Sequence, residues 1–350
     1  MSNFGFMNTL VLIFIDTEID PRSKNILDLG AVDSNDNQLH SSSIKDFSDF
    51  INGADYLCGH NIIDHDLPVL EKALQKDISD IPVIDTLYLS PLLFPKKPYH
   101  KLLKDDKLQT GDINNPLSDA KKAKDLFYDE QGAFNKLNEN LKAINYLLLK
   151  GNNHFSSFFR YVNYSVDNIS AKELILQEFD SQICSNVDLD KIIKDEPEAL
   201  AYSLALIRTD SRVSITPSWV YHKFPAIERV MFQLRSQPCL EGCPYCDKSF
   251  DAKFGLKYFF NFDNYRTFNG EPLQERAVQA ALNNKSILTI FPTGGGKSLT
   301  YQIPALMAGE NAHALTVIIS PLQSLRKDQV DNLEKKGITE AVTEDVVPWR

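Results

Sequence analysis

The sequence predicts an α/β protein of two or three domains, and three observations support this prediction. Apolar runs with strand periodicity alternate with runs of helical periodicity at both ends of the chain. The chain has 350 residues, whereas one hydrophobic core seldom serves more than about 250 residues. Its composition, with 43% hydrophobic and 24% charged residues, is that of an ordinary soluble protein.

The N-terminal part predicts a mixed sheet with flanking helices. The expected elements are a strand at 10–15, two strands within 25–39 around a turn at 33–37, an amphipathic helix at 44–52 and a long helical region at 117–149. A polar, Lys-rich stretch at 96–115 interrupts this pattern. We place the first domain at residues 1–150.

The remainder of the chain predicts a mostly helical connector at 151–262 and a second α/β region at 263–350. The connector contains an Ala/Leu-rich helix at 197–207 and a cysteine cluster at 239–246. The elements expected after it are a helix at 273–282, a strand at 286–291, a Gly-rich loop at 292–298, a helix at 299–307 and a strand at 315–320.

Charge and cysteine content limit the function classes. A net charge of -10 argues against a surface that binds polyanions everywhere, so contact with nucleic acid requires local basic regions. The apolar run at 10–15 is far shorter than the roughly 20 residues of a membrane helix, and no basic region precedes it, so we expect no membrane contact and a cytoplasmic location. Five cysteines, three of them within eight residues, favour a metal site in a reducing compartment.

The Gly-rich loop has the residues of a phosphate-binding loop. They are Thr293, Gly294, Gly295, Gly296, Lys297 and Ser298. Glycines let backbone amides close around phosphate oxygens, the lysine reaches the terminal phosphates, and the serine hydroxyl can bind Mg²⁺. A Gly-rich turn that precedes Lys-Ser by chance is the alternative, and the strand expected before the loop and the helix after it argue against that reading.

The flanks of this loop resemble RecQ-like superfamily 2 DNA helicases. Phe291 replaces the first glycine of the loop pattern, as in the helicase form. Phe268 and Gln274 match the aromatic residue and the glutamine that contact adenine in that family, and residues 301–306 and 318–325 resemble its next motifs, the latter lying on single-stranded DNA. The resemblance covers about residues 268–338 and implies a partial RecA-like domain that binds ATP, Mg²⁺ and DNA.

The resemblance also predicts a limit on activity. No Asp-Glu-x-His run follows Lys297, so the carboxylates that hold magnesium and activate the attacking water are missing. We expect this chain by itself neither to hydrolyse ATP nor to unwind DNA, and we interpret it as a fragment or truncated product of a longer helicase.

Four carboxylates in the first 120 residues resemble those of DnaQ-like 3'-5' exonucleases, which have an RNase H-like fold. Asp16 and Glu18 are two residues apart on a strand, so their side chains leave the same face of the sheet. Asp66 and Asp119 each stand at the head of an expected helix. The resemblance implies that all four bind two Mg²⁺ or Mn²⁺ ions, which clamp the scissile phosphate and activate water. Asp85 is expected to be a structural helix cap instead.

The general base of that family is missing from the two positions where the family has it. Asn114 occupies the histidine position five residues before Asp119, and Asn115 occupies the alternative tyrosine position. His100 can substitute only if its loop folds back, and a lone loop histidine is more often solvated. Metal binding and catalysis are therefore separate predictions.

Cys239, Cys243 and Cys246 predict a zinc knuckle, in which Gly242 and Pro244 allow the chain to turn back on one ion. Cys184 and His222 are both candidates for the fourth ligand, and three unliganded thiols remain the alternative. The spacing also resembles the iron–sulfur motif of radical SAM enzymes, but that family needs a long barrel where this chain has a phosphate loop.

The leading hypothesis is a DNA-processing enzyme that combines an exonuclease-like domain with a RecQ-like motor, a pairing that resembles Werner-type helicases. The competing hypothesis is a binding module that grips DNA ends or nucleotide without turnover. Both leave the DNA structure preferred, the pathway (repair, recombination or phage defence) and the oligomeric state open.

Overall fold

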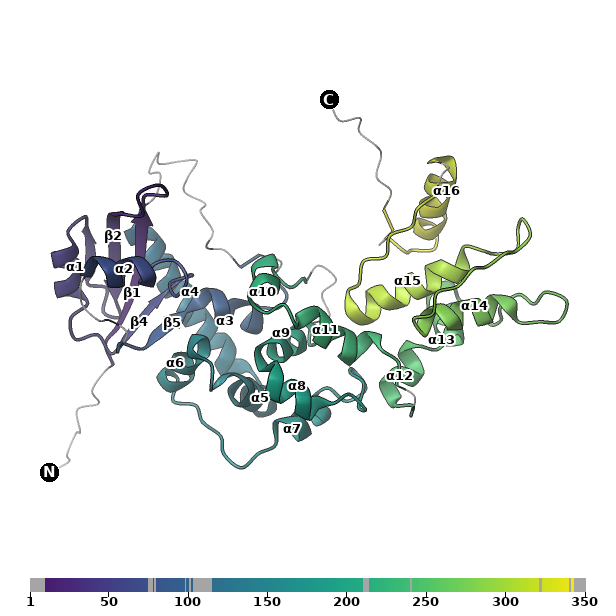
Figure 1. Cartoon of the computed structure of the whole chain (residues 1–350), viewed down its shortest axis with the longest axis horizontal. Helices are drawn as coiled ribbons and strands as arrows, with labels where there is room; N and C mark the ends of the chain where they lie inside the picture. Colours follow the sequence, from purple (N-terminus) through teal and green to yellow (C-terminus); the bar gives the residue numbers. More distant parts are fainter. Residues whose placement is uncertain are drawn as a thin grey trace. The chain divides into compact units, whose positions relative to one another are not determined.

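A computed structural model describes residues 10–74, 78, 80–97, 99–100, 102, 115–209, 214–239, 241–320, 323–339 and 341–342. Packing divides the chain into two compact units (Figure 1). Unit 1 comprises Met1–Glu178 and Asp188–Val230, and unit 2 comprises Phe179–Val187 and Met231–Arg350. The three domains expected from the sequence stay predictions, since these units follow packing and divide the chain at other residues.

Unit 1 is built on a five-stranded mixed sheet, which confirms the α/β prediction. The strands are β1 (Leu12–Ile19), β2 (Ile26–Asp33), β3 (Gln38–Ser41), β4 (Tyr56–Gly59) and β5 (Val83–Asp85), in the order β3-β2-β1-β4-β5. β1 pairs antiparallel with β2 and parallel with β4. The hairpin between β2 and β3 closes at the expected turn, where Asp33 accepts hydrogen bonds from the backbone N–H groups of Asn35 and Asn37.

Side chains alternate between the two faces of β1, so the two faces contact different parts of unit 1. Ile13 and Ile15 belong to a core cluster that also contains Phe47 of α1 (Ile44–Phe50) and Leu70 of α2 (Leu67–Leu74). Phe14 points the other way, and its ring centroid lies 5.7 Å from that of Phe127 on α4. Asp16 and Glu18 continue the Phe14 side, so the strand carries carboxylates toward α4.

Nine further helices belong to unit 1 in the residues that the structure describes. They are α3 (Thr86–Leu93), α4 (Pro116–Lys136), α5 (Glu139–Leu149), α6 (Asn153–Tyr161), α7 (Ala171–Glu178), α8 (Leu189–Asp195), α9 (Pro197–Ile207), α10 (Ser218–Lys223) and α11 (Ile227–Met231), with Met231 assigned to unit 2. The long helical region expected at 117–149 is confirmed, apart from one break. Leu137 leaves the helical conformation and Asn138 caps α5 by accepting a bond from the Leu141 N–H at 2.8 Å.

The regular elements of unit 2 in its described residues are helices, joined by irregular segments. Its elements are η2 (Phe232–Ser236), α12 (Pro244–Ser249), α13 (Ala252–Phe260), α14 (Leu273–Leu282), α15 (Leu299–Ala312) and α16 (Gln323–Glu334). α13, α14 and α15 pack around Leu256, Val278 and Ile303. The described helices of both units include none that is long and apolar enough to cross a membrane.

The two strands expected in unit 2 are wrong. Residues 286–291 and 315–320 are irregular, and Leu288, Ile290 and Ile319 are 89%, 85% and 93% exposed. An apolar strand of a parallel sheet requires neighbouring strands on its edges and helices on its faces. Between residues 241 and 320 the structure contains only the isolated bridge between Phe268 and Glu271, so these segments have no strand partner there.

Candidate functional sites

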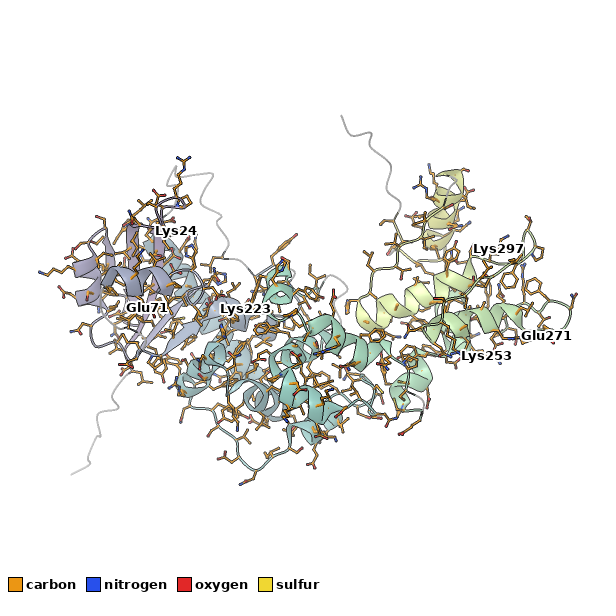
Figure 2. The ribbon with its side chains drawn as sticks, viewed as in Figure 1. Lys24, Glu71, Lys223, Lys253, Glu271 and Lys297 are labelled. Carbon is orange, nitrogen blue, oxygen red and sulfur yellow. The ribbon has the colours of Figure 1, made fainter. Side chains whose placement is uncertain are left out.

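The Gly-rich loop lies directly before α15, and Figure 2 places Lys297 at the start of that helix. Gly294 and Gly296 have positive φ angles of 75° and 72°, which residues with a Cβ rarely adopt. A Cβ at Gly294 would meet no atom within 4 Å, whereas a Cβ at Gly295 would lie 2.9 Å from the Pro292 oxygen. The glycines therefore give a tight loop with open space at its first turn.

The glutamine predicted to contact adenine is hydrogen-bonded to this loop. Gln274 is 1% exposed, and its Nε2 donates to the Gly296 carbonyl at 2.8 Å. Its Oε1 accepts from the Arg266 backbone N–H at 2.9 Å. The Arg266 guanidinium also donates to the Gly294 carbonyl. Arg266 was not singled out by the sequence reasoning, and the only signal was its place two residues before Phe268.

The predicted aromatic residue lies beside the start of the loop. The rings of Phe268 and Phe291 are stacked, with centroids 4.8 Å apart and an interplanar angle of 14°. The structure thus brings Phe268 and Gln274 together with the loop, although Phe291 does not leave a strand as expected. Folding of these residues relies on side-chain contacts with α14 rather than on a sheet.

Lys297 and Ser298, the residues expected to contact phosphate and Mg²⁺, lie directly before Leu299, the first residue of α15. Lys297 Nζ donates to the Phe291 carbonyl at 3.1 Å, so its ammonium group lies across the loop. Ser298 is the N-cap residue of α15, without a capping bond from its side chain. The helix N-terminus supplies a favourable field for an anion. Thr293 lies in the turn before Gly294.

A second site gathers three carboxylates in unit 1. Asp16 and Glu18 on β1 and Asp119 on α4 offer oxygen atoms that all lie within 4.8 Å of one another. Asp119 is 8% exposed and stands in the first turn of α4, whose N-cap Asn115 accepts from the Ser118 N–H at 3.1 Å. Oxygen ligands in this arrangement suit Mg²⁺ or Mn²⁺.

The approach of α4 to this carboxylate group depends on a residue that the sequence reasoning missed. Gly30 on β2 pairs with Asp16, and a Cβ at Gly30 would lie 2.1 Å from the Leu117 nitrogen. The absence of a side chain therefore lets the first turn of α4 lie directly on the sheet. A glycine inside a strand is the sequence signal for such an approach.

Asp66, the fourth predicted ligand, lies at the edge of β1 and is not part of the three-carboxylate group in the described residues. The pairing of β1 with β4 ends at Phe14 and Cys58, and beyond it Asp66 Oδ1 accepts from the Thr17 N–H at 2.9 Å and from Thr17 Oγ1 at 2.5 Å. The aspartate is 1% exposed. Thr17 lies between Asp16 and Glu18 along β1, and its side chain leaves the opposite face of the strand from theirs.

Two histidines, His60 and His100, lie close to each other in unit 1. His100 is 6% exposed and its Nδ1 shares a hydrogen bond of 2.8 Å with Ser90 Oγ, so the expectation of a solvated loop histidine is wrong. The His60 ring contacts Thr86 Oγ1 at 2.9 Å and lies near the backbone of His100. Burial lowers the pKa of both histidines to about 4, so both are neutral at physiological pH. Asn114 falls outside the described residues.

Asp85 is confirmed as a helix cap. It is the N-cap of α3 and accepts backbone N–H bonds from Leu87 at 2.9 Å, Asn61 at 2.8 Å and Ile63 at 3.1 Å. Burial raises its pKa to about 7, and these three donors oppose that rise. The bonds hold the segment after β4, which leads to Asp66.

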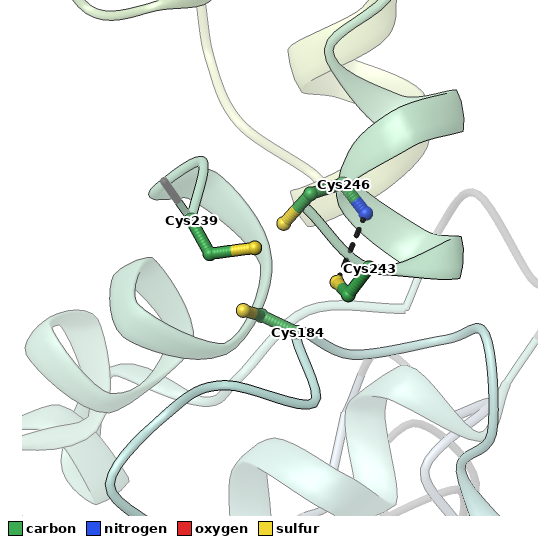
Figure 3. A group of neighbouring side chains, drawn as sticks. All are labelled: Cys184, Cys239, Cys243 and Cys246. Carbon is green, nitrogen blue, oxygen red and sulfur yellow. Dashed lines mark hydrogen bonds between the residues drawn. The ribbon is translucent and has the colours of Figure 1, made fainter. Parts of the chain in front are cut away.

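The predicted cysteine knuckle acquires a fourth thiol (Figure 3). The Sγ atoms of Cys184, Cys239, Cys243 and Cys246 all lie within 4.8 Å of one another. His222, the other candidate, does not belong to this group in the described part of the chain. Burial acts to raise the pKa of Cys243, but hydrogen bonds from the backbone of Cys246 and Ser185 bring it down to about 7.

Comparisons with known proteins concern the region of the phosphate loop. Residues 271–347 match the family model of the DEAD/DEAH box helicase. ATP-dependent helicase SGS1 of Saccharomyces cerevisiae is 49% identical over 67 residues, 19% of this chain and 5% of that protein. The ATP-dependent DNA helicases RecQ of Haemophilus influenzae and Bacillus subtilis are 47% and 46% identical over 83 and 86 residues, 24% and 25% of this chain and 12% and 13% of theirs.

These matches support a RecQ-like helicase segment, which agrees with the geometry around Gln274 and the Gly-rich loop. The chain spans between 5% and 13% of the length of these three relatives. No solved structure matches the chain.

Proposed function

We propose that the chain is part of a RecQ-like ATP-dependent DNA helicase, and that residues 263–350 contribute to its ATP-binding motor domain. The observation that carries this proposal is the hydrogen bond from Gln274 Nε2 to the Gly296 carbonyl, in the loop directly before α15. This bond connects the residue expected to contact the adenine base with the loop expected to bind the phosphates. Unwinding belongs to the whole protein in this proposal, because the chain spans a small part of its relatives.

The residues of the loop fit a nucleotide with Mg²⁺. Amides of residues 294–298 and the N-terminus of α15 would bind phosphate oxygens, and Ser298 Oγ would bind the ion. Lys297 would exchange its bond with the Phe291 carbonyl for a phosphate oxygen. Phe268, stacked on Phe291, would lie against the adenine, and Gln274 would have to release at least one of its two backbone partners to contact the base.

Direct measurement of ATP binding tests this proposal. Lys297→Ala should weaken binding of Mg–ATP by at least tenfold in isothermal titration calorimetry, because the loop loses its only cationic side chain between residues 291 and 298. Lys285→Ala removes an exposed lysine of the same unit and should leave the affinity unchanged. Equal affinities for the wild type and Lys297→Ala would refute the proposal.

For residues 1–150 we propose a DnaQ-like two-metal site that acts on DNA 3' ends. The three-carboxylate group of Asp16, Glu18 and Asp119 supports it, and Asp66 is hydrogen-bonded to Thr17, the residue between Asp16 and Glu18 on β1. The strand order β3-β2-β1-β4-β5, with the first carboxylates on the central strand, is compatible with an RNase H-like sheet. Bound Mg²⁺ or Mn²⁺ would supply the activated water and the charge that stabilises the leaving group.

The alternative within this proposal is a site that grips DNA ends without cleaving them. With asparagine at residue 114, no protein base stands at the position that the family uses. His60 and His100 are neutral, but both rings already share hydrogen bonds with Thr86 and Ser90. Metal-bound water would then have to lose its proton to solvent.

Degradation of a 3'-labelled single strand with Mg²⁺ or Mn²⁺ separates these two outcomes. Asp16→Asn should abolish shortening of the strand, and Asp49→Asn, an exposed carboxylate on α1, should retain it. Shortening of the labelled strand by both variants would refute the nuclease proposal. Retained binding of the strand without shortening by the wild type would favour the end-binding alternative.

A further inference from the structure

The four cysteines come from three separate segments of unit 2. Cys184 lies between α7 and α8, Cys239 follows η2, and Cys243 and Cys246 are the N-cap and a residue of α12. Their mutual Sγ separations of no more than 4.8 Å are close to those of a tetrathiolate zinc site. Zn–S bonds of about 2.3 Å place tetrahedral sulfurs roughly 3.8 Å apart, so modest rotations of the side chains would close the group.

Hydrogen-bond donors beside two of the thiols, Cys239 and Cys243, suit negatively charged sulfur. Asn186 Nδ2 donates to Cys239 Sγ at 3.4 Å, and the Cys246 N–H donates to Cys243 Sγ at 3.4 Å, the bond drawn in Figure 3. Asn186 also donates to the Gly242 carbonyl at 3.0 Å. Donors of this kind orient the sulfur ligands and lower the energy of their thiolates.

The backbone is also shaped for a knuckle. Gly242 has a φ of 75°, and Pro244 begins α12 immediately after Cys243. Tyr245 fixes the turn from the opposite side, since its hydroxyl donates to the Arg235 carbonyl at 2.6 Å. Together these features favour a chain that turns back toward Cys239.

Three of the four thiols are buried as well as close together. Cys184, Cys243 and Cys246 are 3%, 6% and 5% exposed, and all four cysteines are reduced. Four thiolates packed together without a cation would repel one another strongly in a medium of low dielectric constant. A divalent ion removes that repulsion, and four sulfur ligands leave no open position for a substrate.

We propose that Cys184, Cys239, Cys243 and Cys246 bind one Zn²⁺ ion in a closed structural site. Segment 179–187 is grouped with unit 2, although the residues on both sides of it belong to unit 1. Its described contacts with the 231–246 region include the bond from the Cys184 N–H to the Leu234 carbonyl at 2.8 Å. The ion would fasten this segment to the knuckle and thereby stabilise unit 2. This site is independent of the nuclease and helicase proposals.

Metal analysis of the purified chain after dialysis against metal-free buffer tests the site. We expect one zinc ion per chain in the wild type and in Cys58→Ser, which changes a buried cysteine of unit 1. Cys184→Ser should lower zinc affinity by at least tenfold. Cys184→His should restore most of that affinity, because imidazole is also a zinc ligand and a merely structural defect would not be repaired in this way.

Replacement of zinc by Co²⁺ identifies the ligand class, since tetrahedral cobalt thiolates absorb intensely in the visible and near ultraviolet. The measurement is made in an Asp16→Asn background to remove the carboxylate group as a competing metal site. Unchanged zinc affinity in Cys184→Ser would overturn the four-ligand assignment. Purified chain that contains iron, or that neither holds nor takes up zinc, would overturn the zinc site.

Discussion

Asp16 on β1 pairs directly with Gly30 on β2, and the space above Gly30 is filled by the first turn of α4. This relationship links the register of a hairpin to the distance between carboxylates that are about a hundred residues apart in the chain. Asp119 can lie close to Asp16 and Glu18 because residue 30 on the neighbouring strand has no side chain.

Gly30→Ala should therefore separate Asp119 from Asp16 and Glu18. The added Cβ would lie 2.1 Å from backbone nitrogen, so α4 must move, and we expect a loss of stability of about 2 kcal/mol or more. Affinity for Mn²⁺, measured by electron paramagnetic resonance, should fall at least tenfold. Gly132→Ala on α4 meets no atom within 4 Å and should leave metal binding unchanged.

Gly296→Ala should disturb the nucleotide site more than Gly294→Ala does. Both glycines have positive φ angles, so both substitutions strain the backbone. Only the Cβ at residue 296 would meet Gln274, at 2.5 Å from Nε2. ATP affinity should therefore fall at least tenfold further in Gly296→Ala. Equal losses in the two variants would mean that the Gln274 contact does not matter for binding.

Glu130→Gln should stabilise unit 1 at neutral and alkaline pH. Glu130 on α4 is fully buried, and neither carboxyl oxygen has a hydrogen-bond partner in the described residues. Burial, helped by the charge of Asp85, raises its pKa well above the usual value. Its contribution to stability is thus complete below a pH of about 4.5 and is lost as the pH rises through the higher folded pKa.

Urea unfolding followed by circular dichroism at pH 5 and pH 8 checks this prediction. The wild type should lose stability between these two pH values, and Glu130→Gln should lose less of it, with a gain of about 1–3 kcal/mol at pH 8. Glu71→Gln changes an exposed carboxylate on α2 and serves as the control. A glutamine variant that follows the wild type at both pH values would contradict the assignment.

His100 should contribute to unfolding in acid. Burial lowers its pKa to about 4 in the folded chain, so the unfolded state binds a proton first as the pH falls below about 6.5. Stability is therefore lost between pH 6.5 and pH 4, by about 1–3 kcal/mol. His100→Gln should reduce this loss in thermal melts, while His222→Gln, an exposed histidine on α10, should not. Parallel pH profiles of the wild type and His100→Gln would exclude this role.

The sequence by itself determined the local elements and the chemistry of the candidate residues. An apolar, β-branched run at 10–15 located the start of β1, and the two-residue spacing of Asp16 and Glu18 placed both on one face. Helical periodicity located α9 at its observed bounds. Loop residues 293–298 and the cysteine knuckle were recognisable because their spacing is local. Strand periodicity failed at 286–291 and 315–320, since a strand also needs partners that supply hydrogen bonds and cover apolar side chains.

Only the tertiary structure decided which distant residues meet. It selected Cys184 over His222, placed Gln274 under Gly296, buried His100 and showed why residue 30 is glycine. The physical reason is that periodicity records which face of an element is apolar, whereas the partner of that face is chosen by the packing of the whole chain. Residues that are far apart in sequence carry no spacing that reveals their contact.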